Sequence, residues 1–287
     1  MTGKEIRNER KRKVVTSNYL TRNQIVLSAR ERKIVTYLIS RIKPGDDKNT
    51  RYSFQIREFC EVCGIDYLNN VSGVKDAIRR LANKSEWVRT TEQRNGKTVK
   101  AELLFRWMES VEFVPDSGIV EFNFPRNMGD QLYELRKNFT EFQLISVLGM
   151  KNKYSIHFYQ YLVSFKSIGK VEMTLEELRE VLQLGDKYRN YKDLNKFVLK
   201  TVIKEINFFS DIEVEIQKIS EAGKTVSSLV FFINKNEENL ESDFTTVNYT
   251  LDRGLPSLRM QDKELKKHLA EISSMQEYAD LLSQGRD

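Results

Sequence analysis

The chain repeats part of itself, and this repeat constrains the fold more than any other feature. The segment NGKTVKAELLF at 95–105 resembles AGKTVSSLVFF at 222–232, at an offset of 127 residues. Upstream, FQIREFCEVCG at 54–64 resembles MTLEELREVLQLG at 173–185. Between these blocks each half carries a longer amphipathic segment, near 70–84 and near 190–207. The same order of elements therefore occurs twice, which predicts two related domains.

The first half has the pattern of several helices followed by a hairpin. Ser28 and Glu31 have capping-box spacing, so a helix is expected to begin there, and Pro44-Gly45 is expected to end it. Asn95-Gly96 is a strong hairpin signal because both residues tolerate a positive φ. The other expected elements are a strand near 51–54, helices over 55–63 and 70–84, and strands near 86–93, 98–107 and 118–124.

The second half predicts the same plan. Thr174 and Glu177 have capping-box spacing and are expected to begin a helix that reaches about Leu184. The other expected elements are helices near 127–136, 140–149, 153–166 and 190–207, and strands near 211–219 and 226–234. Two helices joined by a short turn and followed by a hairpin describe a winged helix, whose second helix enters the major groove of DNA. The predicted fold class is α+β, with two tandem winged-helix domains related by the repeat.

Charge is distributed unevenly along the chain. The formal net charge is +6, but residues 236–287 carry 11 acidic and 6 basic residues. The remainder is strongly basic, which favours a polyanionic partner. We therefore expect four segments, namely a basic N-terminal arm over 1–15, winged-helix domains over 16–125 and 126–235, and an acidic tail over 236–287. The arm, which lacks the apolar stretch of a signal peptide, is expected to have no fixed structure and to lie along phosphates.

The tail allows two interpretations. It has partial helical spacing of apolar residues at Leu265, Leu269, Ile272, Ala279 and Leu282. A disordered, solubilising end is one interpretation, and a segment that folds on a host replication protein is the other.

The strongest candidate for DNA contact is the predicted helix at 190–207. From 187 to 204 there are six basic residues and one acid, whereas an ordinary solvated helix face would interleave both signs. Four lysines follow one another at four-residue steps and form a stripe beside the apolar face, since each step turns by only ~40°. The predicted DNA-binding residues here are Lys187, Arg189, Lys192, Asn195, Lys196, Lys200 and Lys204. Asn195 is the candidate base reader, although its helical angle lies close to the apolar side.

The first half offers a shorter basic run, and each hairpin offers basic residues near its turn. Lysines mostly bind phosphate, whereas arginine and asparagine can read base edges. Exposed lysines are also common at hairpin tips without any binding role. The predicted contacts in these places are Lys75, Arg79 and Arg80 on the predicted helix at 70–84, Arg94 and Lys97 on the first hairpin, and Lys218 and Lys224 on the second hairpin.

Enzyme chemistry fails on the residues present, so we expect no enzymatic activity and no cofactor. The two GKT triplets are not phosphate loops, because Thr91 and Lys218 stand where the pattern needs a glycine. Cys60 and Cys63 lack further zinc ligands at short spacing, and we expect them to face the packing between helices. A chain with only two cysteines fits a reducing cytoplasm. The sequence has no run of about 18 apolar residues, so we expect no membrane span.

The second half also resembles a known family. VEMTLEELREVLQLGDKYRNYKDLNKFVLKTVIKEINFFSDIEVEIQKISEAGKTVSSLVFFI at 171–233 is similar to the second winged helix of theta-type plasmid replication initiators. KVVTSNYLTRNQIVLSARERKIVTYLISRI at 13–42 fits the opening of their first domain, and the resemblance extends over about 13–235. It implies that a monomer binds repeated origin sequences, called iterons, opens the strands and recruits host replication factors. It also implies a homodimer, formed through the first domain, that represses the protein's own gene.

Two other classes of protein share these DNA-binding parts. One is a transcriptional regulator without initiation activity, and the other is a structural or partition protein that coats DNA. Direct repeats of roughly two helical turns beside the gene favour an initiator, whereas a single palindrome favours a regulator.

Overall fold

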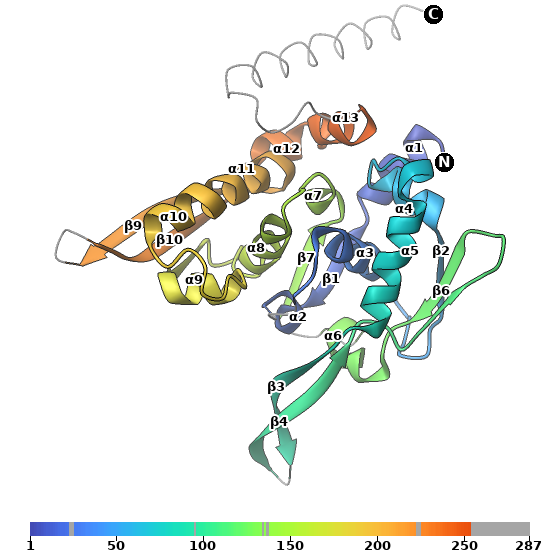
Figure 1. The fold of residues 1–287 in the computed structure, drawn as a ribbon, viewed down its shortest axis with the longest axis horizontal. Helices are drawn as coiled ribbons and strands as arrows, with labels where there is room; N and C mark the ends of the chain where they lie inside the picture. Colours follow the sequence, from blue (N-terminus) through green and yellow to red (C-terminus); the bar gives the residue numbers. More distant parts are fainter. Residues whose placement is uncertain (23–25, 95, 134, 136–137, 222–224, 254–287) are drawn as a thin grey trace, which may run out of the picture.

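The computed structural model describes residues 1–22, 26–94, 96–133, 135, 138–221 and 225–253. Helices pack against small antiparallel sheets, and two long hairpins extend away from the body (Figure 1). Each half of the repeat supplies one of these hairpins. Within the described residues no helix is long and apolar enough to cross a membrane.

The first half contains the expected helices and hairpin. The capping box of Ser28 and Glu31 is confirmed, since the Ser28 hydroxyl accepts from the Glu31 N–H and the Glu31 carboxylate accepts from the Ser28 N–H. Gly64 has a φ of +63° and forms the turn between the two helices that pair in this half. The elements are α3 (Ala29–Ile39), β2 (Tyr52–Gln55), α4 (Ile56–Val62), α5 (Tyr67–Asn83), β3 (Ser85–Arg94) and β4 (Lys97–Arg106).

The second half follows the same order and closes into a three-stranded sheet. The capping box of Thr174 and Glu177 is confirmed at the start of the first helix. Strand β8, which the sequence analysis did not predict, pairs with the hairpin to give the order β8-β10-β9. The elements are β8 (Lys170–Thr174), α9 (Leu175–Val181), α10 (Tyr191–Leu194), a π-helical turn (Asn195–Leu199), α11 (Lys200–Phe209), β9 (Ile212–Glu221) and β10 (Thr225–Lys235).

The two halves differ in how their sheets are completed. In the first half β3 and β4 form a two-stranded hairpin that does not include β2. Strand β2 pairs instead with β6 (Ile119–Asn123), and β6 pairs with β5 (Ser110–Phe113), a strand absent from the sequence prediction. The repeat therefore preserves the order of elements but not the choice of strand partners.

The segment between the halves corrects two predicted helices. The expected helix at 127–136 is reduced to a 3₁₀ turn (Arg126–Met128) and α6 (Gly129–Leu132). The expected helix at 140–149 is wrong in its first part, because Phe139–Gln143 forms strand β7. Strand β7 buries alternate residues and pairs with β1 (Lys13–Ser17) from the start of the chain. Two helices follow, α7 (Ile145–Leu148) and α8 (Lys153–Val163).

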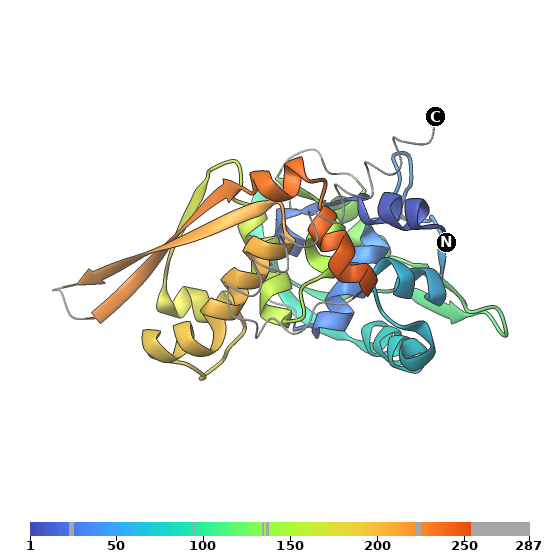
Figure 2. The same ribbon diagram turned by 90° about the horizontal axis from the view of Figure 1, so that it is seen from above.

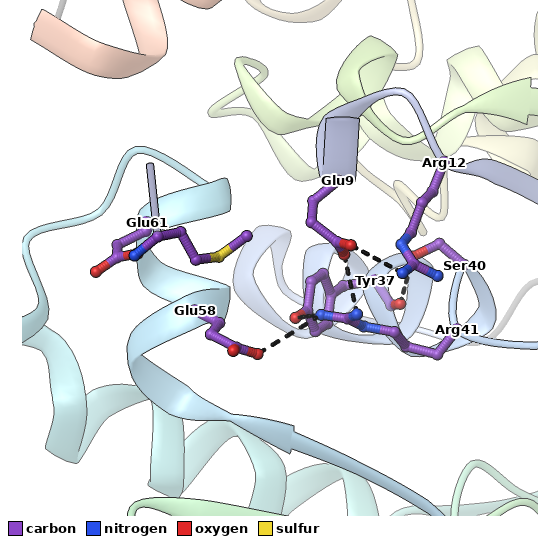
Figure 3. A network of polar contacts seen from close by, with 8 residues as sticks. Glu9, Arg12, Tyr37, Ser40, Arg41, Glu58 and Glu61 are labelled. Atoms are coloured by element: carbon purple, nitrogen blue, oxygen red, sulfur yellow. Dashed lines mark hydrogen bonds and ion pairs between the residues drawn. The ribbon is translucent and has the colours of Figure 1, made fainter. Parts of the chain in front are cut away.

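The prediction of an N-terminal arm without fixed structure is wrong. Residues Gly3–Arg10 form helix α1 with a capping box at Thr2, and a short helix α2 (Asn18–Arg22) follows β1. Glu9 on α1 pairs with Arg41, which follows α3, and the N-terminal ammonium of Met1 pairs with Glu61 on α4 (Figure 3). The Glu9 carboxylate forms ion pairs with Arg12 at 2.8 Å and with Arg41 at 2.9 Å, and the Arg41 guanidinium lies over the Tyr37 ring. The basic residues of this segment are thus partly engaged inside the protein.

The first part of the acidic tail is also folded. After β10 the chain forms α12 (Glu237–Glu241) and α13 (Thr245–Arg253), and α13 lies between α12 and α1 (Figures 1 and 2). We call residues 236–253 the C-terminal strap. Asn239 ties α12 to the second half by donating to the carbonyls of Phe208 and Ser210. The five apolar residues from Leu265 to Leu282 that were singled out in the tail lie outside the described residues.

Arg10 holds the far end of the strap on the first half. Its side chain is fully buried, and its guanidinium donates to the carbonyls of Glu61 and Val62 at the end of α4. The same group donates to Asn248 at 3.1 Å and pairs with Asp252 at 2.8 Å, both on α13. The strap therefore runs from the second winged helix back to the first.

Candidate DNA-binding surface

A π-helical turn interrupts the second helix of the second half. The sequence predicts one α-helix over 190–207, and the structure has α10, the π turn and α11 as consecutive segments from Tyr191 to Phe209. The helix begins at Asn190, whose side chain accepts from the Asp193 N–H at 2.8 Å. Single π turns inside α-helices are rare and frequently mark functional sites.

The π turn straightens the lysine stripe. In a regular α-helix, three four-residue steps from Lys192 to Lys204 would drift by about 120° around the axis. A turn closed by i→i+5 bonds holds one extra residue, which offsets about 100° of that drift. The four lysine positions therefore lie closer to one line, away from the buried side chains of Val198 and Val202.

Exposure divides the predicted contacts of this half into two groups. Lys187, Arg189, Lys192, Lys196 and Lys200 are exposed, and together they define what we call the second basic surface. Arg189 pairs with Asp186 at 2.6 Å, but both side chains are largely exposed, so water and salt screen this pair.

The other two predicted residues of this helix are less accessible. Lys204 is half-buried and has a partner within the protein. Asn195 is half-buried in the π turn, consistent with its expected angle close to the apolar side. Its assignment as a base reader stays a prediction.

On the corresponding helix of the first half, α5, two of the three predicted basic side chains have partners within the protein. Lys75 is half-buried, and Arg79 pairs with Asp76 at 2.8 Å while its guanidinium lies 5.2 Å from the centre of the Phe113 ring. Arg80 donates to the capping-box carboxylate of Glu31 at 3.0 Å. Arg80 is therefore the cation of this helix with a buried acidic partner, whereas the exposed Arg79–Asp76 pair is screened in the same way as the Arg189–Asp186 pair.

The electrostatics of Glu31 explain why Arg80 has a structural partner. Burial raises the pKa of the Glu31 carboxyl, but hydrogen bonds from Ser28 and Arg80 outweigh it and hold the pKa below its usual range. The carboxylate thus stays charged near neutral pH, where it both caps α3 and holds Arg80. The sequence alone showed the capping box but not the arginine that faces it.

The hairpins place only some of the predicted wing residues. Lys97 is exposed at the start of β4, and Lys218 is exposed on β9 with its ammonium 5.1 Å from the centre of the Tyr191 ring. Lys224 lies outside the described residues, and so does the side chain of Arg94. All wing contacts stay predictions.

Sequence reasoning missed two aromatic residues at this surface. Phe197 is exposed on the π turn, and its ring stacks on that of Tyr188, with centroids 5.8 Å apart. Both lie among the cations of the second basic surface. The available signal was an aromatic residue at a helical position between Lys196 and Lys200, away from the apolar stripe.

The two cysteines are confirmed as core residues. Cys60 and Cys63 are buried and unpaired, and burial raises the pKa of their thiols to about 11 and about 12. Both thiols are therefore protonated near neutral pH. Within the described residues no group of three or more His, Cys, Asp or Glu side chains could hold a metal ion.

Comparison with known proteins gives consistent matches. The family described as "Initiator Replication protein, WH1" matches residues 13–163, and that described as "Initiator Rep protein, WH2" matches residues 174–233. A "Replication initiation protein" of Escherichia coli is 26% identical over 234 residues, covering 78% of this chain and 70% of the relative. An "Uncharacterized 27.6 kDa protein" of Escherichia coli is 21% identical over 233 residues, covering 77% of this chain and 95% of the relative.

A solved structure shows the same architecture. The crystal structure of Pi initiator protein in complex with iteron DNA superposes with a TM-score of 0.66 at 19% identity, covering 79% of this chain and 98% of the other. At this identity the match establishes the fold. The predicted α+β class with two tandem winged helices is thereby confirmed.

Proposed function

Because the chain belongs to the initiator replication protein family, we propose that it starts replication of a plasmid by binding iteron repeats at the origin as double-stranded DNA. The resemblance to plasmid replication initiators inferred from the sequence is confirmed by this membership. The observation that carries the binding proposal is the second basic surface, where five exposed cations lie on and beside the second helix of a winged helix. That helix is the element such folds insert into the major groove.

Two domains in one chain set the expected size of the site. Successive major grooves on one face of DNA lie ~10 base pairs apart, so one monomer with both second helices inserted covers roughly 20 base pairs. Footprinting a monomeric preparation on the DNA beside the gene tests this. Protection confined to a single groove would contradict engagement of both domains, and a single palindrome in place of direct repeats would favour a regulator.

The second basic surface should make binding depend on salt through Lys196. A lysine that contacts phosphate releases condensed counterions, so Lys196→Ala should weaken binding to all sequences and reduce the slope of log affinity against log salt by about one unit. Lys196→Glu should be far worse, because it places a negative charge beside the DNA backbone. Circular dichroism checks the fold, which should survive because the side chain is exposed. A folded Lys196→Glu variant with unchanged affinity and salt slope would remove this helix from the interface.

The first half supplies the matched comparison. Arg79→Ala should reduce affinity less than Lys196→Ala, because Arg79 already has Asp76 and Phe113 as partners. Arg80→Ala should act mainly on stability, because it leaves the buried Glu31 carboxylate with one donor fewer. A salt titration of each variant, together with thermal unfolding without DNA, separates the two effects.

Recruitment of host replication proteins and formation of a homodimer are further parts of this proposal, supported by the resemblance to plasmid initiators. The strap changes how the tail is tested. Truncation after Asn236 would remove α12 and α13, including the buried side chains of Phe244 and Val247, and expose the core surface that they cover, so the cut belongs after Arg253. A chain ending there should keep its DNA affinity and lose plasmid maintenance. If maintenance survives, residues 254–287 do not carry the partner site.

A further inference from the structure

Phe197 is an exposed aromatic side chain at the centre of a charged surface. It retains 54% of its accessible area, whereas the neighbouring apolar residues Val198 and Leu199 are buried. Single exposed apolar side chains are common, and the part of a ring that stays in water contributes little to the stability of the fold. One that stands on the second helix of a winged helix therefore invites a role in binding.

The Phe197 ring has two close neighbours. It stacks on Tyr188 with an interplanar angle of 29°, and the Lys196 ammonium lies 5.0 Å from its centroid. Tyr188 itself packs against the core and has a φ of +55°, a left-handed conformation that is rare for a bulky residue. The loop before the helix thus places the Tyr188 ring against the Phe197 ring, and more than half of the Phe197 area still remains accessible to solvent.

The surrounding charge selects the partner. Lys187 and Arg189 flank Tyr188 in sequence, and Lys196 adjoins Phe197, so an apolar protein surface would have to desolvate several cations to reach the ring. A polyanion meets no such penalty. In the major groove of duplex DNA the apolar group on the base edges is the C5-methyl of thymine, which phenylalanine is able to contact.

We propose that Phe197, positioned by Tyr188, contacts the C5-methyl group of one thymine in the major groove and thereby specifies that base pair within the iteron. This inference rests on the proposed function. It assigns sequence recognition to an aromatic side chain, whereas the exposed lysines around it contact phosphates and carry little sequence information.

The test removes one methyl group at a time. Each thymine of the footprinted duplex is replaced by deoxyuridine, which lacks only the C5-methyl, and affinity is measured for the full-length protein. One buried methyl is worth about a threefold to fivefold change in affinity. The wild-type protein should lose that factor at one position, and Phe197→Ala should bind the thymine and deoxyuridine duplexes equally at that position.

Matched variants separate this contact from general binding. Lys196→Ala should lower the affinity for both the thymine and the deoxyuridine duplex and leave the ratio of the two affinities unchanged. Ile168→Ala, which truncates an exposed side chain in the turn before β8, should change neither the affinities nor their ratio. Phe197→Leu should keep part of the preference for thymine. Circular dichroism and thermal unfolding confirm that each variant is folded.

The experiment distinguishes failure of the thymine contact from failure of iteron binding. If the wild-type protein shows no preference at any thymine, or if folded Phe197→Ala keeps the full preference, the inference is overturned while iteron binding stands. If Phe197→Ala loses more affinity for single-stranded DNA than for duplex DNA, the ring stacks on unpaired bases. That result would also overturn the inference. A protein that binds no iteron duplex refutes the proposed function itself.

Discussion

Arg10→Ala should release the C-terminal strap from the first winged helix. The guanidinium is completely buried and donates to two carbonyls at the end of α4 and to Asn248 on α13. It also pairs with Asp252 at 2.8 Å. Truncation removes a side chain that reaches from α1 to both α4 and α13.

The cost follows from what the truncation leaves behind. Each buried acceptor without a donor costs about 1–3 kcal/mol. The Val62 carbonyl and the Asn248 Oδ1 lose Arg10 as their donor, whereas the Glu61 carbonyl still accepts from the Gly64 N–H. The Asp252 side chain is 43% exposed and can be hydrated, so the ion pair adds no more than about 1 kcal/mol. The lost aliphatic stem adds about 1–2 kcal/mol, and water entering the space recovers part of the carbonyl cost. We expect a net loss of about 3–5 kcal/mol in the free energy of unfolding.

Two measurements read this out. Urea unfolding gives the total loss in the free energy of unfolding. As controls, Arg10→Met retains most of the packing and Asp252→Asn removes only the exposed ion pair. Hydrogen–deuterium exchange gives the location, and protection should fall in 245–253 before it falls in β9 or β10. If Arg10→Ala costs under about 1 kcal/mol, the range of ordinary surface changes, and exchange in α13 is unaltered, Arg10 does not hold the strap.

Two further predictions concern the core. Burial lowers the pKa of His157 well below its usual value, so the unfolded state takes up a proton as pH falls below about 6.5 and the folded state does not. The free energy of unfolding should therefore drop by about 1.4 kcal/mol between pH 7.5 and 5.5. Urea unfolding at the two pH values measures this drop, which His157→Gln should abolish. An equal drop in the variant would assign it to other groups. A Cβ at Gly149 would lie 2.1 Å from the buried Phe209 ring, so Gly149→Ala should lower the free energy of unfolding by about 1–3 kcal/mol. A Cβ at Gly129 would have nothing within 4 Å, so Gly129→Ala should leave the melting temperature nearly unchanged in thermal unfolding. Equal melting temperatures for the two variants would show that Phe209 yields freely.

Local signals predicted the elements that depend on near neighbours in the chain. The capping boxes at Ser28 and Thr174 act over three residues, and both begin helices at the expected positions. The turn at Asn95-Gly96 and the alternation around it predicted a hairpin whose strands pair from Ser85 to Arg106. The burial of Cys60 and Cys63 was expected because they lack further zinc ligands at short spacing.

Predictions failed where the deciding contact comes from a distant part of the chain. Residues 139–143 became a strand because β1, more than a hundred residues earlier, offers a paired edge in register. The choice of β6 as the partner of β2 in one half, and of β10 as the partner of β8 in the other, cannot be read from the repeat. The N-terminal segment is ordered because Glu9 and Arg10 have partners on α3, α4 and α13.

The sequence by itself determined that two helix–helix–hairpin units follow one another and that the second carries the denser run of cations. These features depend on periodicity and spacing within a few turns of chain. Only the tertiary structure decided which cations are free. Arg79 lies over Phe113 and Arg80 pairs with the buried carboxylate of Glu31, both distant in sequence, whereas Lys196 and its exposed neighbours face solvent beside Phe197. The reason is physical, because the availability of a charge depends on what the folded chain places within a few ångströms of it.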